Sequence, residues 1–174
     1  GSMAVLGMNE FKIMEMLIDV ELRAYKGLNI RAIFLQNVIT DLILGLGIAE
    51  VFAAYCDYIR KRYKVLPGLI TQNMPRLKAF LEKAGIDGVV ICTSFNRIGY
   101  LMSPDVESYV KAAEANDPSR YQLMAMSTMA SGAIPARDAY DFINRQKVQS
   151  IVFGASSEKN IRETVSLISD APVG

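Results

Sequence analysis

The apolar positions along the chain follow two different spacings. Over residues 8–25 they recur every three or four positions, which predicts an amphipathic helix that Gly27 ends. Residues 31–35 form a short, nearly continuous apolar run, and a run of this length predicts a buried parallel strand. Helical spacing returns over 48–63, where the last turn carries a cluster of cations of the kind that a helix C-terminus favours.

The same succession then repeats to the end of the chain. Local signals mark the helix ends, with Asn73 as an N-cap, Gly85 as a C-cap and Ser156 or Ser157 as the cap of the last helix. About five strand–helix units therefore alternate, which predicts an α/β protein with a parallel sheet covered by helices. The four further strands are expected at 65–70, 88–93, 121–126 and 148–153.

Two architectures fit this alternation. One is a partial TIM-like (β/α) barrel of about five parallel units, and the other is an open doubly wound sheet. A complete barrel needs about 250 residues, or about 200 at the least, and the chain has 174. Glycines and prolines stand singly at element boundaries, so residues 4–174 are expected to form a single domain, and Gly1-Ser2-Met3 is typical of a scar left by tag removal.

The longest apolar stretch runs from Val38 to Ala54. Asp41 and Glu50 interrupt it, so it is expected to enter the core and not to span a membrane. The chain shows no signal-peptide pattern, and its two cysteines have neither a metal-ligand nor a disulfide spacing. These features predict a cytoplasmic protein with two free thiols.

Charge and composition exclude several classes of function. Nineteen Lys and Arg residues against eighteen Asp and Glu give a net charge of +1, so we expect no nucleic-acid partner. The chain has no histidine, which removes the commonest general base, the commonest zinc ligand and every Ser-His-Asp arrangement. We therefore expect no metal site, and the sequence offers no catalytic residue.

Functional groups in such folds gather where the strands end. The residues expected there are hydroxyls and amides, which can bind a ligand but supply no acid or base. The strongest element is Gly154-Ala155-Ser156-Ser157, because free amides and hydroxyls at a helix start suit a phosphate; the alternative is plain N-capping. Arg97 could bind an anion, although a surface ion pair is the favoured interpretation, and Cys92 is interpreted as a buried small hydrophobe.

The order of these residues resembles the C-terminal part of the aldo-keto reductase family, whose members are β/α barrels that use NADPH. Residues 150–164 resemble the family's cofactor-binding strand and helix, in which a Gly-Ala-Ser turn precedes the helix. Residues 125–132 are similar to its Tyr-Ser-Pro-Leu stretch followed by Ser-Gly, and Phe95-Asn96 stands where Tyr-Asn-Pro is frequent. Residues 33–37 are similar to the strand that normally ends in the active-site histidine, and 68–77 to a Gly-Val-Ser-Asn-Phe segment.

The resemblance implies an NADPH or phosphate site without reductase activity. Gln36 stands at the histidine position, and the family's Asp, Tyr and Lys belong to units that would precede Met8. The groups that hold the nicotinamide also differ, with Ile70, Thr71, Cys92 and Met126 at those positions. The cofactor-binding residues that the resemblance retains are Ser127, Gly154, Ala155, Ser156, Ser157 and Asn160.

Two other functions remain open from the sequence. The chain could be a fragment of an active NADPH-dependent oxidoreductase, or a non-enzymatic oligomeric interaction scaffold. Five parallel strands of a partial barrel have two open edges and an uncovered apolar inner face. We therefore expect a homo-oligomer that covers the open barrel.

Overall fold

The computed structural model describes residues 8–169, so the predicted tag scar and residues 4–7 and 170–174 of the expected domain lie outside the described residues. The predicted α/β class is confirmed. The elements are α1 (Met8–Leu22), η1 (Arg23–Tyr25), β1 (Ala32–Leu35), α2 (Asn37–Leu46), α3 (Ala49–Tyr63), β2 (Leu66–Thr71), α4 (Met74–Ala84), β3 (Val89–Ser94), α5 (Val106–Glu114), β4 (Tyr121–Met126), η2 (Ala130–Gly132), α6 (Ala136–Ile143), β5 (Ser150–Ile151) and α7 (Glu158–Ser169).

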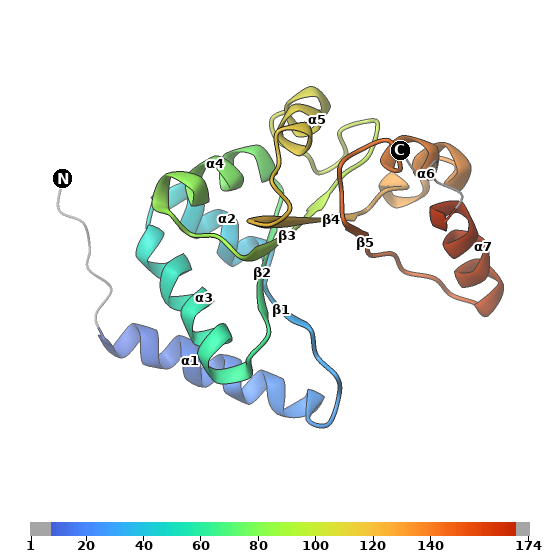
Figure 1. Ribbon diagram of the computed structural model, residues 1–174. Helices are drawn as coiled ribbons and strands as arrows, with labels where there is room; N and C mark the ends of the chain where they lie inside the picture. The colour runs from blue at the N-terminus through green and yellow to red at the C-terminus, as the bar shows by residue number, and fades with distance from the viewer. Residues whose placement is uncertain (1–7, 170–174) are drawn as a thin grey trace.

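The five strands form one parallel sheet in which each strand pairs with the next in the chain, in the order β1-β2-β3-β4-β5. A doubly wound sheet reverses its strand order at a switch point, and the described residues contain no such reversal. The order is that of consecutive units of a β/α barrel, and α3, α4, α5 and α6 follow one another in an arc outside the strands (Figure 1).

The predicted caps position the helices. The Asn73 side chain accepts a hydrogen bond from the Arg76 backbone N–H at 3.2 Å and so begins α4. Gly85 ends the same helix in the left-handed conformation, with φ of 69°. These two signals fix the length of α4, and its apolar residues then face the sheet.

The hydrophobic core lies between the sheet and the helices. Leu69, Ile91 and Leu123 point from the three central strands toward the helices and are at most 1% exposed. They pack in one cluster with large side chains from α3 and α4, among them Phe52, Ile59, Leu77 and Leu81. This burial supplies the main driving force for folding.

The other face of the sheet is covered more than expected. Val90 and Cys92 of the central strand are 3% and 4% exposed, so the expectation of a fully uncovered inner face is wrong. Part of this face is covered by local packing: the ring of Phe34 on β1 lies over Gly68 on β2, where the absence of a side chain leaves it room. The sheet can therefore bury part of this face with its own side chains.

Two elements differ from the sequence prediction. The apolar stretch beginning at Val38 contains the separate helix α2, and only its Thr40, Ile43 and Leu44 face is buried, whereas the whole stretch was expected in the core. Strand β5 pairs over two residues instead of the six predicted at 148–153. No described helix is both long and apolar enough to cross a membrane.

Candidate functional site

Hydrogen bonds join α2, the helix that follows β1, to the end of β2. Asp41 on α2 accepts hydrogen bonds from the Thr71 hydroxyl and from the Gln72 backbone N–H, the latter at 3.0 Å. Both carboxylate oxygens are thereby used, and α2 is fixed to the end of β2. The Thr71 hydroxyl and the Gln72 backbone N–H, at the end of β2, thus serve to hold the fold together.

A second set of bonds joins β2 to β3. The Tyr109 hydroxyl donates to the Gln72 carbonyl at 2.8 Å and accepts from the Met74 N–H at 3.2 Å. Thr93 donates to the Thr71 carbonyl at 2.9 Å. Burial raises the pKa of Tyr109, so its hydroxyl stays protonated as the network requires.

Asn96 shapes the loop that follows β3. Its side chain donates to the Tyr100 carbonyl and accepts from the Tyr100 N–H, both at 2.9 Å, and it is 1% exposed. Its neighbour Arg97 lies 3.3 Å from Asp138 on α6, so the favoured interpretation of Arg97 as a surface ion pair is confirmed. Both partners are about half exposed, so this pair contributes little stability.

A hollow of about 590 Å³ lies where β3, β4 and β5 end. Ser127, directly after β4, and Gly154, after β5, both line it, so the fold brings together two predicted cofactor-binding residues that are distant in sequence. Its size is within the usual range of small-molecule sites. Its wall is formed by Tyr100, Leu101, Met126–Met129, Ser131, Gly132, Tyr140 and Val152–Gly154.

Tyr140 on α6 is the lining residue that sequence reasoning missed. Its side chain is fully buried, and its hydroxyl has no hydrogen-bond partner among the described residues. A buried hydroxyl without a partner costs free energy unless another group satisfies it. The helical spacing around Tyr140 marked it only as a core residue, and no local pattern distinguishes a wall residue from a core one.

The loop between β4 and α6 is held in an unusual backbone conformation. Five non-glycine residues of the described chain have positive φ, and three of them are Ser127, Ala130 and Ser131 in this loop. A fourth, Leu101, also lines the hollow. Such conformations cost about 1–3 kcal/mol each and gather at sites where a loop must take a defined shape.

The remaining predicted residues lie beyond Gly154, at the exposed start of α7. The Ser157 hydroxyl accepts from the Asn160 N–H at 3.2 Å and caps the helix, and the Asn160 amide lies 3.4 Å from the Ser156 hydroxyl. Ala155, Ser156 and Asn160 are exposed. The N-capping alternative is thus realised, and it leaves the Ser156 side chain accessible beside the hollow.

Ionisable groups are scarce around the hollow. Its lining contains two tyrosines but no carboxylate, lysine, arginine or cysteine. The described residues also form no cluster of three or more metal-ligating side chains. Cys92 lies on the other side of the central strand from the helices, and burial raises its pKa to about 11, so it remains a protonated thiol.

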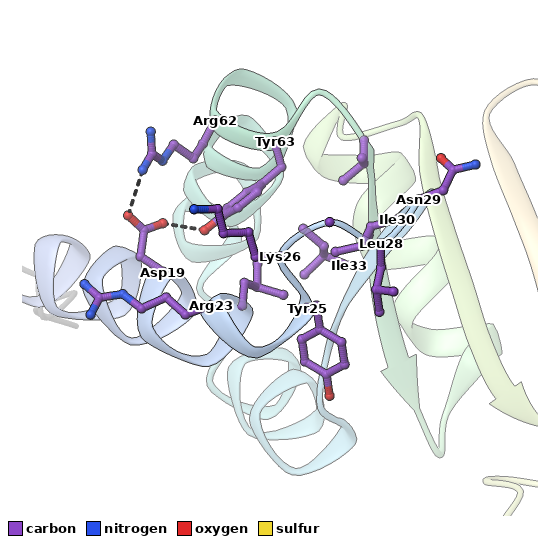
Figure 2. A pocket seen from close by; sticks show the side chains of 13 residues that line it. Asp19, Arg23, Tyr25, Lys26, Leu28, Asn29, Ile30, Ile33, Arg62 and Tyr63 are labelled. Carbon is purple, nitrogen blue, oxygen red and sulfur yellow. Dashed lines mark hydrogen bonds and ion pairs between the residues drawn. The ribbon is translucent and has the colours of Figure 1, made fainter.

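A second hollow, of about 520 Å³, lies at the opposite end of the sheet, before β1 and β2 (Figure 2). Asp19 on its wall accepts a hydrogen bond from the Tyr63 hydroxyl and lies 3.4 Å from Arg62 (Figure 2). It also accepts a hydrogen bond from the Tyr58 hydroxyl. The Tyr58 bond is the main cause of the lowered pKa of Asp19, followed by the Tyr63 bond. These contacts attach α1 to α3 and have a structural role.

No family model, no curated protein and no solved structure matches the chain. The relationship to aldo-keto reductases therefore rests on the residues quoted above and stays a prediction.

Proposed function

We propose that this chain binds a phosphate-bearing dinucleotide, with NADPH as the expected ligand, in the hollow at the ends of β3, β4 and β5. The observation that carries the proposal is that Ser127 and Gly154, which are distant in sequence, line one ligand-sized hollow. Both belong to the six predicted cofactor-binding residues, and the other four lie beyond the hollow, at the start of α7.

The phosphates would lie at the start of α7. This turn follows Gly154 directly, and its exposed Ser156 side chain and helix N-terminus favour a negative charge. A ligand with a neutral part in the hollow and phosphates at α7 would therefore use both regions. A dinucleotide has both a neutral part and phosphates of this kind.

We further propose that the bound nucleotide is not oxidised by this chain alone. NADPH supplies a hydride, and a carbonyl that receives it needs a proton donor close by. The lining of the hollow contains no carboxylate, lysine or arginine that could supply this proton, and its ionisable side chains are Tyr100 and Tyr140. Gln36, at the position of the family's histidine, lies in a different groove, beside α1.

The test is a fluorescence titration of NADPH with the purified chain, which contains no tryptophan to contribute its own signal. We expect saturable binding in the micromolar range, competition by adenosine phosphates, and no NADPH consumption when an aldehyde is added. Absence of saturable binding at about 1 mM NADPH, a level at which even weak specific sites fill, would refute the proposal.

A further inference from the structure

Helix α1 is apolar on two opposite faces. Phe11, Met14 and Ile18 pack toward the core, as an amphipathic helix should. The opposite face carries Ile13, Met16, Leu17 and Val20, which are 53–59% exposed. A helix that is apolar on both sides is usually covered on both sides.

Helix α2 has the same property in a stronger form. Its outward face carries Val38, Ile39, Leu42 and Leu46, with exposures from 44% to 70%. Asp41 is its one charged residue, and Asp41 is bound to Thr71 and Gln72 on the inner side. The outward face of α2 therefore carries no charged side chain that would make its exposure to water favourable.

A groove of about 680 Å³ lies between these helices, with the edge strand β1 as its floor. Ile13 and Leu17 of α1 line one wall and Ile39 of α2 the other, and Glu21 is the one charged lining residue. We define the apolar surface formed by α1, the β1 edge and α2 as the α1–β1–α2 face. It combines a groove with an adjacent ridge, namely the outward side chains of α2.

The area of this face indicates that its partner is a protein. The eight exposed apolar residues of α1 and α2, of which Ile13, Leu17 and Ile39 line the groove, together present on the order of 800 Å² of accessible surface, which is about what each partner contributes to a stable protein interface. Monomeric proteins seldom leave so large an apolar patch in water. A net charge of +1 means that two copies of the chain repel each other only weakly.

We propose that a second copy of this chain packs on the α1–β1–α2 face. A twofold axis places the α2 ridge of each copy in the groove of the other, because ridge and groove lie side by side on the same face. The same arrangement covers β1, an open edge of the sheet. The homo-oligomer expected from the sequence would thus cover this face and not the inner face of the sheet.

The experiment measures the mass in solution by multi-angle light scattering from about 5 to 200 µM, a range that brackets the dissociation constants of ordinary dimers. The test variant is the double substitution Leu42→Glu and Leu46→Glu. Both side chains are exposed in the single chain, so each copy should still fold, which circular dichroism and thermal melting verify. The matched control is Ile161→Glu with Val165→Glu, two exposed apolar residues on α7, the helix that follows the opposite edge strand β5.

We expect a dimer for the natural chain and for the control, and a dimer weakened about 100-fold or more in the test variant, because carboxylates would be buried without partners. A natural chain that is monomeric throughout this range would overturn the proposal. So would an assembly of any size that persists in the folded test variant. NADPH titration of the same samples tests the proposed cofactor binding independently of the oligomeric state.

Discussion

The ring of Phe34 occupies the space that a side chain at Gly68 would need. The two residues are register partners on β1 and β2, and a Cβ built on Gly68 would fall well inside contact distance of the ring. Both belong to strands whose backbone cannot move without loss of the ladder bonds. We therefore expect Gly68→Ala to destabilise the fold by about 1–3 kcal/mol, which is the usual range for overpacking.

Urea denaturation measures this effect, and Gly154→Ala is its control, since nothing lies within 4 Å of a Cβ there. In Phe34→Ala the space is already free, so adding Gly68→Ala should cost much less than it does in the natural chain. An equal loss in the free energy of unfolding in the two backgrounds would mean that the Phe34 ring does not cause the destabilisation.

Acid should weaken the attachment of α1 to α3. Hydrogen bonds from Tyr58 and Tyr63, with Arg62 beside them, lower the folded-state pKa of Asp19 from its ordinary 3.8. A lowered pKa stabilises the fold above pH 3.8, and this stabilisation is lost as the pH falls through the folded value. Asp19→Asn should therefore be less stable than the natural chain at pH 7, with a difference that shrinks toward pH 3.

Denaturation curves at pH 7, 5, 4 and 3 measure that difference. Asp141→Asn on α6 is a suitable control, because this exposed carboxylate has no ion pair among the described contacts. A difference for Asp19→Asn that is independent of pH would contradict the assigned role of the charge.

The two thiols should be inert in the folded protein. Burial raises the pKa of both Cys56 and Cys92 to about 11, and neither side chain is more than 4% exposed. Ellman's reagent at pH 8 should therefore react with no thiol of the folded chain and with two per chain in guanidinium chloride. Rapid reaction of one thiol under native conditions would show that its strand or helix opens.

Tyr140→Phe should distinguish a ligand contact from a wall residue. The substitution removes the unpartnered hydroxyl and nothing else, so the fold should be equally stable or slightly more so. The hydroxyl is buried, so it contacts the nucleotide only if the wall opens on binding; in that case affinity for NADPH should fall about 5- to 10-fold, which corresponds to one hydrogen bond. The measurement is the same fluorescence titration, with thermal melting beside it, and Tyr100→Phe serves as a comparison at the exposed rim.

Ser156→Glu should abolish binding of the phosphates. It places a negative charge at the start of α7, where the proposed phosphates lie, while leaving the Ser157 cap intact. The substitution also suits a helix N-terminus, so stability should not fall. Calorimetric titration with NADPH measures the loss; unchanged affinity would remove the phosphates from this turn.

Local signals explain why the fold could be predicted. The caps at Asn73 and Gly85 act within one turn of helix, and the strand runs are apolar because both sides of a central strand are covered. Helix α2 was missed because both its buried and its exposed faces are apolar, so the stretch from Val38 was interpreted as one continuous core run. Strand β5 was overestimated because apolar sequence over 148–153 does not reveal how many residues find a partner on β4.

The candidate site was predictable only in part. Ser127 and Gly154 were chosen by their positions after strands, and the fold brings both to one hollow. No sequence pattern shows that Asp41 would bind the Thr71 hydroxyl and the Gln72 backbone N–H, since these contacts join distant segments. The same holds for Tyr140, whose place in the wall depends on how α6 packs.

Because β5 is short, the segment from β5 to α7 unfolds locally more easily than the central strands. Two register pairs join β5 to β4, and Asn144 holds α7 through one hydrogen bond to the Leu167 carbonyl. The segment from β5 to α7 can therefore detach with the loss of few bonds, and its amides should exchange with solvent before those of β2 and β3. Val152–Gly154 form one wall of the hollow, so a ligand bound there would slow this exchange. It would stabilise the attachment of the segment from β5 to α7, which the short strand pairing alone holds weakly.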